Sequence, residues 1–119
     1  GVDAIVVSNH GGNVLDGSLP TLRALPEIVD AVGGKMDVLM DGGVRRGTDA
    51  IKAVALGAKA VLLGRAYVYA LLAAGEPGVR KMLDLFRQQI SEGMQFLGAE
   101  KLGDLDPSLL DFPASWPQR

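Results

Sequence analysis

The stretch Ala4-Ile5-Val6-Val7-Ser8-Asn9-His10-Gly11-Gly12-Asn13 decides the fold class of this chain. Its first half is a continuous apolar run, and such a run predicts a short strand over Ala4–Ser8 that is buried on both faces. Its second half contains the single histidine of the sequence and two glycines. A buried strand that ends this way is typical of the mouth of an α/β active site. A simple strand end with a turn, where the histidine bonds only nearby backbone, would have the same pattern.

The rest of the sequence alternates amphipathic helices with apolar strands. After a loop from Asn9 to about Pro20, the patterns predict helices over Thr21–Val32 and Thr48–Leu56 and strands over Met36–Met40 and Ala60–Leu63. Pro26 inside the first helix predicts a kink or a restart there. This alternation predicts parallel strands with right-handed crossovers, and both an open doubly wound sheet and a piece of a (β/α)8 barrel fit it.

The C-terminal third of the sequence is predominantly helical. A helix is predicted over Ala66–Ala73, with a break at Gly75-Glu76-Pro77-Gly78. A second helix is predicted from Pro77 to about Leu97, and its single apolar stripe favours packing on a core over a membrane or partner helix. One more short helical turn is expected within 102–110, followed by an irregular tail.

The composition narrows the classes of function. The sequence has 119 residues, of which 48% are hydrophobic and 22% charged, so we expect one small packed domain. A net charge of −2, without a block of like charge, argues against non-specific binding to nucleic acid. The lack of cysteine excludes a disulfide and a thiolate metal site, and a single histidine argues against any metal centre.

Two features concern the location and the completeness of the chain. No apolar run reaches the roughly 18 residues that a membrane helix needs, and the N-terminus lacks the basic segment of a signal peptide. We therefore expect a cytoplasmic protein without a transmembrane segment. The chain opens on Gly1-Val2-Asp3, without an initiator methionine and at the edge of a predicted strand, which indicates a piece of a longer polypeptide.

Distinctive residues follow each of the three predicted strands. The carboxyl ends of parallel strands meet at one edge of a sheet, where α/β proteins bind their ligands. Gly42-Gly43 precedes a helix, so its backbone N–H groups can form an anion site, and Gly64 repeats this arrangement one strand later. Arg45 and Arg65 add positive charge at the same strand ends. This repeated pairing favours a phosphate site over plain turns with solvated arginines.

Two titratable side chains are candidates for further roles at this edge. His10 is a candidate general base because an imidazole titrates near neutral pH. No acidic partner for it can be placed within the chain. Asp41 could accept hydrogen bonds from the hydroxyl groups of a ribose or ribityl chain, or it could cap its own turn.

Five segments, in this order and spacing, carry a resemblance to a known family. They are Ser8-Asn9-His10-Gly11-Gly12, Leu15-Asp16-Gly17, Asp41-Gly42-Gly43-Val44-Arg45-Arg46-Gly47-Thr48-Asp49, Ala55-Leu56-Gly57-Ala58 and Gly64-Arg65. Together they resemble the FMN-dependent 2-hydroxy acid oxidoreductases, the family of glycolate oxidase and of lactate and mandelate dehydrogenases. The resemblance covers the chain up to about Leu110.

The resemblance implies that the chain is the C-terminal portion of a (β/α)8 TIM barrel that binds FMN, from strand six to strand eight and the helices that follow. Residues 1–110 would belong to the barrel and residues 111–119 to an irregular tail. His10 resembles the base that takes a proton from a 2-hydroxy acid, and Ser8 resembles a residue near the flavin. The lining of the ribityl chain and the phosphate is matched by Asp41, Gly42, Gly43, Val44, Arg45, Gly64 and Arg65.

One position departs from the family pattern. The family has an arginine where this chain has Asn13, and that arginine clamps the carboxylate of the substrate. A neutral amide does not replace a bidentate guanidinium. Asn13 is therefore a candidate substrate-binding residue for a substrate other than a simple 2-hydroxy acid. An asparagine here is similar to the branch of the family linked to biosynthesis of the peptide-derived cofactor mycofactocin.

The family's flavin lysine, its substrate-binding tyrosines and the aspartate that orients the histidine all lie upstream of the matched segment. Three strands cannot close a barrel. We therefore expect the remaining N-terminal part of the barrel as a partner, a small-molecule substrate, and a homo-oligomer. By itself, the piece is expected to be inactive.

Two alternatives remain open. The chain could be a non-catalytic truncated fragment that self-associates through its open sheet edges. It could also belong to another FMN- or phosphate-binding barrel, such as type 2 isopentenyl diphosphate isomerase or a relative of IMP dehydrogenase. Such a protein would share the glycine-rich phosphate site, but we would not expect the segment Ser8–Gly12 in it.

Overall fold

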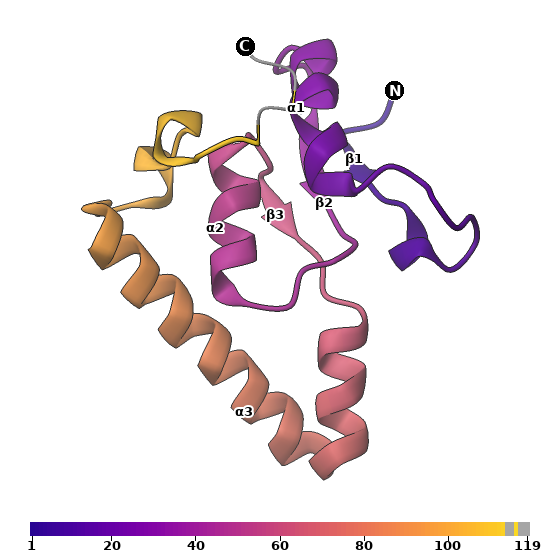
Figure 1. The fold of residues 1–119 in the computed structure, drawn as a ribbon, viewed down its shortest axis with the longest axis vertical. Coiled ribbons are helices and arrows are strands. Elements are labelled where there is room, and N and C mark those ends of the chain that lie inside the picture. Colours follow the sequence, from indigo (N-terminus) through magenta and orange to yellow (C-terminus); the bar gives the residue numbers. More distant parts are fainter. Residues whose placement is uncertain (114–115, 117–119) are drawn as a thin grey trace.

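The structure, a computed structural model, describes residues 1–113 and residue 116. Three parallel strands form one sheet in the order β1 (Ala4–Val7), β2 (Asp37–Met40) and β3 (Ala60–Val61) (Figure 1). In their register, Val7 pairs with Met40, and Leu39 pairs with Ala60. The predicted parallel sheet is therefore confirmed, although β3 is shorter than the sequence indicated.

Helices connect and follow the strands. They are α1 (Thr21–Val32), α2 (Gly47–Ala55) and α3 (Arg65–Leu97), with short 3-10 turns at η1 (His10–Gly12), η2 (Leu102–Asp104) and η3 (Pro107–Leu109). The bounds of α1 agree with the prediction, and those of α2 differ by one residue at each end. No restart occurs at Pro26, because α1 runs through it as one helix. Proline removes only one backbone donor there, and Pro26 is itself buried together with Leu25.

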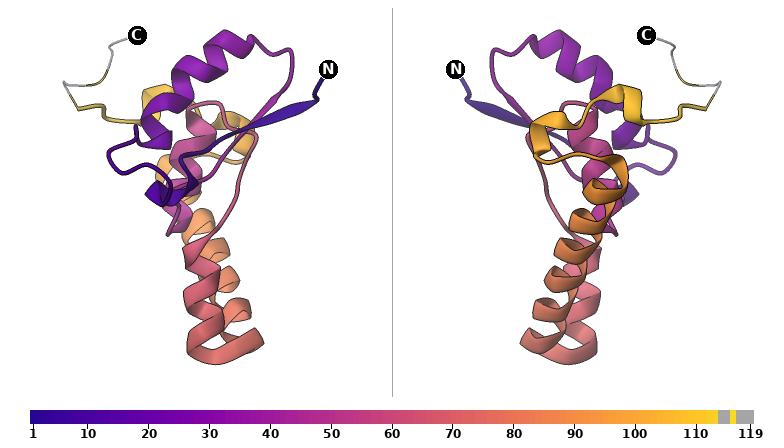
Figure 2. Two further views of the ribbon diagram at one scale, coloured as in Figure 1. Left: turned by 90° about the vertical axis from the view of Figure 1, so that its right-hand side faces the viewer. Right: turned by 90° about the vertical axis from the view of Figure 1, so that its left-hand side faces the viewer.

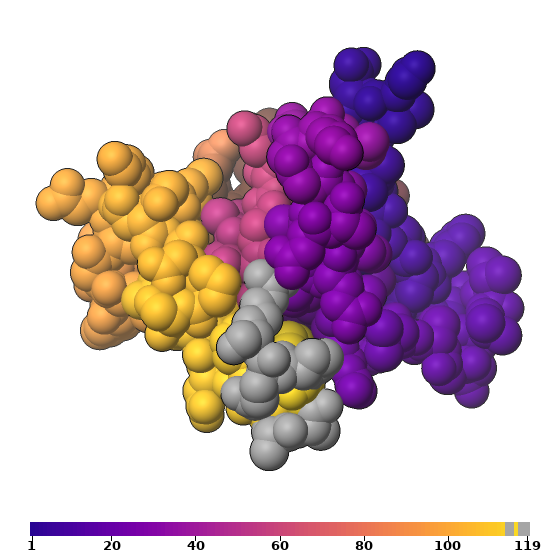
Figure 3. Space-filling model, turned by 90° about the horizontal axis from the view of Figure 1, so that it is seen from above, coloured from indigo at the N-terminus to yellow at the C-terminus, as the bar shows by residue number. Residues whose placement is uncertain are grey.

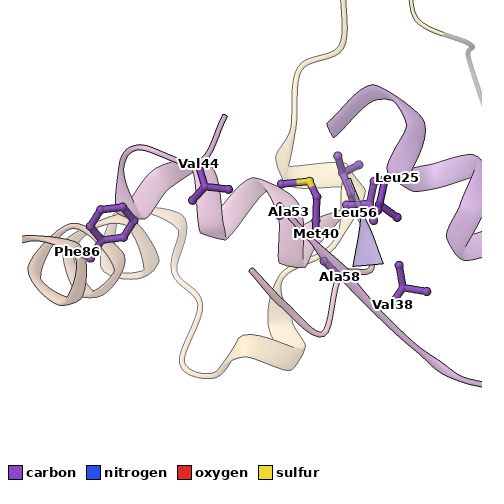
Figure 4. Close-up of a cluster of buried hydrophobic side chains, with 9 residues drawn as sticks. Leu25, Val38, Met40, Val44, Ala53, Leu56, Ala58 and Phe86 are labelled. Atoms are coloured by element: carbon purple, nitrogen blue, oxygen red, sulfur yellow. The ribbon is translucent and has the colours of Figure 1, made fainter. Parts of the chain in front are cut away.

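The core lies between the sheet and the two helices α1 and α2 (Figure 4). Leu25 of α1 and Met40 of β2 are fully buried, and α2 and the loop after it contribute Ala53, Leu56 and Ala58 to the same cluster. Both helices thus cover one face of the sheet. Sequential strand order with both crossover helices on one face is the arrangement of a (β/α)8 barrel wall, whereas a doubly wound sheet has helices on both faces.

The other face of the sheet has no helix in the described part of the chain. Val7 of β1 is buried under the helices, whereas Val6 points the opposite way and is 47% exposed. The expectation that β1 is buried on both faces is therefore wrong for this chain. Alternate side chains of a strand point to opposite faces, and only one face is covered here.

Helix α3 consists of two arms that meet at a sharp bend. Ala74 (φ −152°) and Gly75 (φ 61°, ψ −146°) are not helical, which confirms the predicted break. The arms project together beyond the sheet (Figure 2). Phe86 of the second arm is buried in the main core, and Ile90 and Met94 pack on a cluster that contains Ile51 of α2. Gly98 ends the helix in the left-handed conformation, with φ 69°.

The segment after α3 returns to the core. The two turns η2 and η3 replace the single short helical turn that the sequence predicted within 102–110. Leu110 and Phe112 pack against the main core cluster, and the rings of Phe112 and Trp116 lie 5.6 Å apart. This segment is yellow in the space-filling view of Figure 3. Of the predicted tail, residues 114–115 and 117–119 lie outside the described residues.

Candidate functional site

The loops that follow the three strands line one cavity of about 780 Å³. Loop β1–α1 contributes His10, Gly11 and Asn13, and loop β2–α2 contributes residues 41–45. The loop after β3 and the start of α3 contribute residues 62–66. Side chains of α3, among them Tyr69 and Met82, complete the lining. The cavity thus brings together all of the candidate site residues except Ser8.

His10 lies on the rim of this cavity in an unusual backbone conformation. Its φ of 54° is in the left-handed region, and it is the one residue other than glycine with positive φ in the described part of the chain. Ser8 lies behind it, and its Oγ accepts a hydrogen bond of 3.1 Å from the His10 N–H. The turn is closed by two backbone hydrogen bonds, from Gly12 to Asn9 and from Asn13 to His10. These contacts hold the His10 backbone in place while its side chain is exposed.

Arg65 joins the two outer strand ends across the cavity. Its Nη2 donates a hydrogen bond of 2.8 Å to the carbonyl oxygen of Gly11, although the two residues are 54 positions apart in the sequence. A Cβ at Gly11 would lie 3.1 Å from the same Nη2 atom. A guanidinium has about five N–H donors, so this contact leaves others for an anion. Arg65 could therefore bind an anion while it keeps its contact with Gly11.

The turn after β2 exposes backbone donors. Gly42 and Gly43 have φ of 80° and 83°, a conformation that L side chains rarely adopt. A Cβ at Gly42 would also lie 2.7 Å from Asn9 Oδ1, so this position lacks both the conformation and the space for a side chain. Among the described residues, the N–H groups of Gly42 and Gly43 have no hydrogen-bond acceptor. They remain available to a ligand.

Two buried oxygen atoms beside this turn have no hydrogen-bond donor among the described residues. They are Asn9 Oδ1 and Asp41 Oδ1. An unpaired buried acceptor costs free energy, so such atoms often mark the place of a ligand or water. Asp41 lines the large cavity, and its Oδ1 has an unused capacity to accept a hydrogen bond. In the described part of the chain, no hydrogen bond joins the Asp41 carboxylate to its own turn, so the alternative that it caps this turn gains no support.

Three side chains that the sequence analysis did not identify form hydrogen bonds with the backbone of this loop. Thr21 Oγ1 donates to the Asp41 carbonyl at 2.6 Å, and it lies 3.0 Å from the Gly42 carbonyl. Asp49 Oδ2 accepts from the backbone N–H groups of Arg45 and Arg46, both at 2.9 Å. Gln89 Oε1 accepts from the Gly47 N–H at 2.8 Å. An acid in the first turn of a helix could have indicated Asp49, but no local pattern indicated Thr21 or Gln89.

Two further properties of the described residues bear on function. No group of three or more His, Cys, Asp or Glu side chains among them could hold a metal ion, and none of their helices has the length and hydropathy of a membrane span. Among the groups that the structure describes, the one clear pKa shift lies outside the cavity lining. Hydrogen bonds from Ser108, through its side chain and its backbone N–H, lower the pKa of Asp106 at the start of η3.

Comparison with known proteins identifies relatives along most of the chain. The model of the family "FMN-dependent dehydrogenase" matches residues 1–112. An L-lactate dehydrogenase from a Caulobacter species is 54% identical over 110 residues, which is 92% of this chain and 29% of that protein. A pre-mycofactocin synthase from Mycolicibacterium smegmatis is also 54% identical, over 107 residues, which is 90% of this chain and 27% of that protein.

Solved structures agree with this result. A mandelate oxidase with benzoyl-formic acid superposes with a TM-score of 0.85 at 50% identity, over 88% of this chain and 31% of that chain. A flavocytochrome b2 variant with sulfite bound gives a TM-score of 0.88 at 43% identity, over 93% of this chain and 30% of that chain. The chain therefore spans about 30% of the length of these relatives and matches part of the (β/α)8-barrel dehydrogenases. The match of the family model to residues 1–112 is consistent with the parallel sheet and with the cavity at the strand ends. The chain belongs to the FMN-dependent dehydrogenase family.

Proposed function

We propose that the protein to which this chain belongs is an FMN-dependent oxidoreductase that oxidises a 2-hydroxy acid or a related substrate. The observation that carries the proposal is the cavity at the strand ends, which joins one histidine, two arginines and two adjacent glycines with free N–H groups. The relatives named above include a lactate dehydrogenase and a mandelate oxidase, which supports this class of substrate.

The residues of the cavity fit the chemistry of FMN. The N–H groups of Gly42 and Gly43 and the N-terminus of α3 are donors suited to a phosphate. Arg45 and Arg65 supply positive charge beside them. The unpaired Asp41 Oδ1 is an acceptor for a hydroxyl group of the ribityl chain. When bound, FMN supplies an acceptor for two electrons.

We assign the proton transfer to His10. A neutral imidazole has a ring nitrogen that can accept a proton from the substrate. The exposed His10 and the glycine turn line the same cavity, so a ligand that fills this cavity would contact both. Ser8 supports the backbone of His10 through its Oγ and does not line the cavity. We therefore propose that Ser8 acts through His10.

Asn13 lines the cavity and bears on the substrate. Its amide can form hydrogen bonds but does not supply the charge that binds a free carboxylate in two places. Asn13 therefore favours a related substrate without this carboxylate over a simple 2-hydroxy acid, which is what the resemblance to the mycofactocin branch implies. Sequence identity does not distinguish the two branches of the family, because the lactate dehydrogenase and the pre-mycofactocin synthase are each 54% identical to this chain.

A titration with FMN tests the proposed cofactor site. The intact protein is freed of flavin and titrated while the quenching of flavin fluorescence is followed. Arg45→Gln removes a charge from the cavity lining, and Arg46→Gln is the matched control, because Arg46 is the next residue and does not line the cavity. We expect Arg45→Gln to weaken FMN binding by about tenfold, the effect of losing one charge-assisted hydrogen bond, and Arg46→Gln to leave it unchanged.

The opposite results would contradict the proposal. Failure of the wild-type protein to bind FMN would rule out the proposed cofactor. Equal losses in the two arginine variants would show that only the overall positive charge matters, and the cavity would then not be the phosphate site. Turnover assays with lactate, mandelate and an amide lacking the carboxylate then separate the two substrate classes.

A further inference from the structure

Thr21 is buried directly behind the glycine turn. It is the first residue of α1, and only 3% of it is exposed. Its Oγ1 lies 2.6 Å from the Asp41 carbonyl oxygen and 3.0 Å from the Gly42 carbonyl oxygen. A hydroxyl group has one hydrogen to donate, so it is shared between two carbonyl groups that point to the same atom. Two successive peptide groups are therefore oriented by one side chain.

The orientation of these peptides fixes where their N–H groups point. Described peptide bonds are trans, so each N–H points opposite to the carbonyl group of the same peptide. Because the carbonyl groups of Asp41 and Gly42 point to Thr21, the N–H groups of Gly42 and Gly43 point away from it. Both glycines line the large cavity and a second cavity of about 350 Å³, whereas Thr21 lines the second one and not the large one. The free N–H groups thus point away from Thr21, which is absent from the lining of the large cavity.

We propose that Thr21 is a positioning residue for anion binding, an inference that rests on the proposed FMN site. Its hydroxyl group holds the carbonyl groups of Asp41 and Gly42 away from the large cavity and so presents the N–H groups of Gly42 and Gly43 to the phosphate. Thr21 does not line that cavity and acts only through the turn.

The conformational freedom of the two glycines makes the orientation of the turn depend on this hydrogen bond. Glycine adopts both signs of φ at little cost, so the peptide between Gly42 and Gly43 can rotate if its carbonyl group loses the donor. Loss of the donor also leaves two partly buried carbonyl groups unpaired, which favours a rotation toward water in the cavity. A rotated peptide would present a carbonyl oxygen to the phosphate in place of an N–H group. The affinity for a phosphate-bearing ligand then falls more than the affinity for the same ligand without phosphate.

The test compares FMN with riboflavin, which lacks the phosphate. The intact protein, freed of flavin, is titrated with each ligand while flavin fluorescence is followed. Thr21→Val keeps the shape of the side chain but removes the hydroxyl group, and Thr21→Ser keeps the hydroxyl group. Thr48→Val is the matched control, because Thr48 is exposed in the first turn of α2.

We expect Thr21→Val to weaken FMN binding by about tenfold, as loss of a buried hydrogen bond does, with a smaller change for riboflavin. Thr21→Ser and Thr48→Val should keep the wild-type ratio of FMN to riboflavin affinity. If Thr21→Val does not fold, Thr21→Cys replaces it, because a thiol has a similar size and is a weak donor.

Three results would overturn the inference. Unchanged FMN binding in Thr21→Val shows that the hydroxyl group does not position the turn. Equal losses for FMN and riboflavin show that Thr21 only stabilises the fold. No FMN binding by the wild-type protein removes the proposed function and this inference together, whereas the first two results leave the proposed function intact.

Discussion

His10 occupies a backbone conformation that few side chains adopt. A left-handed residue other than glycine stores about 1–3 kcal/mol, and such strain gathers at functional sites. Here the strain accompanies a histidine at the mouth of a cavity, whose backbone is held by Ser8 and by the two hydrogen bonds of the η1 turn. His10 lines the same cavity as the glycine turn after β2.

Replacement of His10 by asparagine tests the role of the imidazole as a base while the backbone conformation is kept. Asparagine tolerates the left-handed conformation well, so His10→Asn should keep the fold of η1. It has no group that accepts a proton near neutral pH, and general base catalysis contributes about 10²–10⁴-fold. We expect kcat of the intact protein to fall by about this factor, with FMN binding unchanged. A variant with the wild-type kcat would exclude His10 as the base.

The start of α2 shows how elements far apart in the sequence hold the candidate site. Gly47 is the first residue of α2 and is buried against the second arm of α3. Its N–H donates to Gln89, and a Cβ there would lie 2.7 Å from both Gln89 Cβ and the Phe86 carbonyl oxygen. The loop that carries Arg45 is thus fixed by direct contact between α2 and α3.

Replacement of Gly47 by alanine should force these helices apart. Gly47 does not have positive φ, so the expected effect comes from lack of space alone. We expect Gly47→Ala to lower the free energy of unfolding by about 1–3 kcal/mol, as overpacking does, and to weaken FMN binding. The measurement is denaturant unfolding of the intact protein.

Gly103→Ala is the control for this prediction. Gly103 lies in η2, and a Cβ there would meet nothing within 4 Å. The control should change the free energy of unfolding by less than about 0.5 kcal/mol. Similar values for the two variants would mean that the contact between α2 and α3 is not tight.

The molecule as a whole leaves much apolar surface uncovered. Neither outer edge of the sheet is paired within the described residues, and the face with Val6 has no helix. Phe96 and Leu72 on the two arms of α3 are 91% and 78% exposed. Unpaired strand edges and exposed apolar patches favour association. We propose that other segments of the intact protein, or further copies of it, cover these surfaces.

The 119-residue chain alone should therefore self-associate and show no turnover. Size-exclusion chromatography with light scattering measures the first property, and an assay with added FMN and with lactate, mandelate or an amide lacking the carboxylate measures the second. Val6→Lys places a charge on the open face of β1, and we expect it to shift the chain toward the monomer. A monodisperse wild-type monomer, or hydroxy acid oxidation by the chain alone, would contradict this prediction.

The sequence alone determined the order of the elements and the composition of the candidate site. Apolar runs and glycine stops gave α1 with the bounds found in the structure, and the break in α3 was predicted at the bend. Because parallel strands place their carboxyl ends together, His10, Asp41–Arg45 and Gly64–Arg65 were expected at one edge, and they line one cavity. These features depend on local patterns and on one general rule of parallel sheets.

Only the tertiary structure decided which residues support the loops of the site through hydrogen bonds. The contacts of Thr21 with Asp41, of Gln89 with Gly47 and of Arg65 with Gly11 join positions 20, 42 and 54 residues apart. A local pattern cannot indicate such partners, because they become neighbours only after the strands pair and the helices pack. The exposure of Val6 has the same origin. A strand's composition shows that it can be buried, but the elements packed on each face decide whether it is.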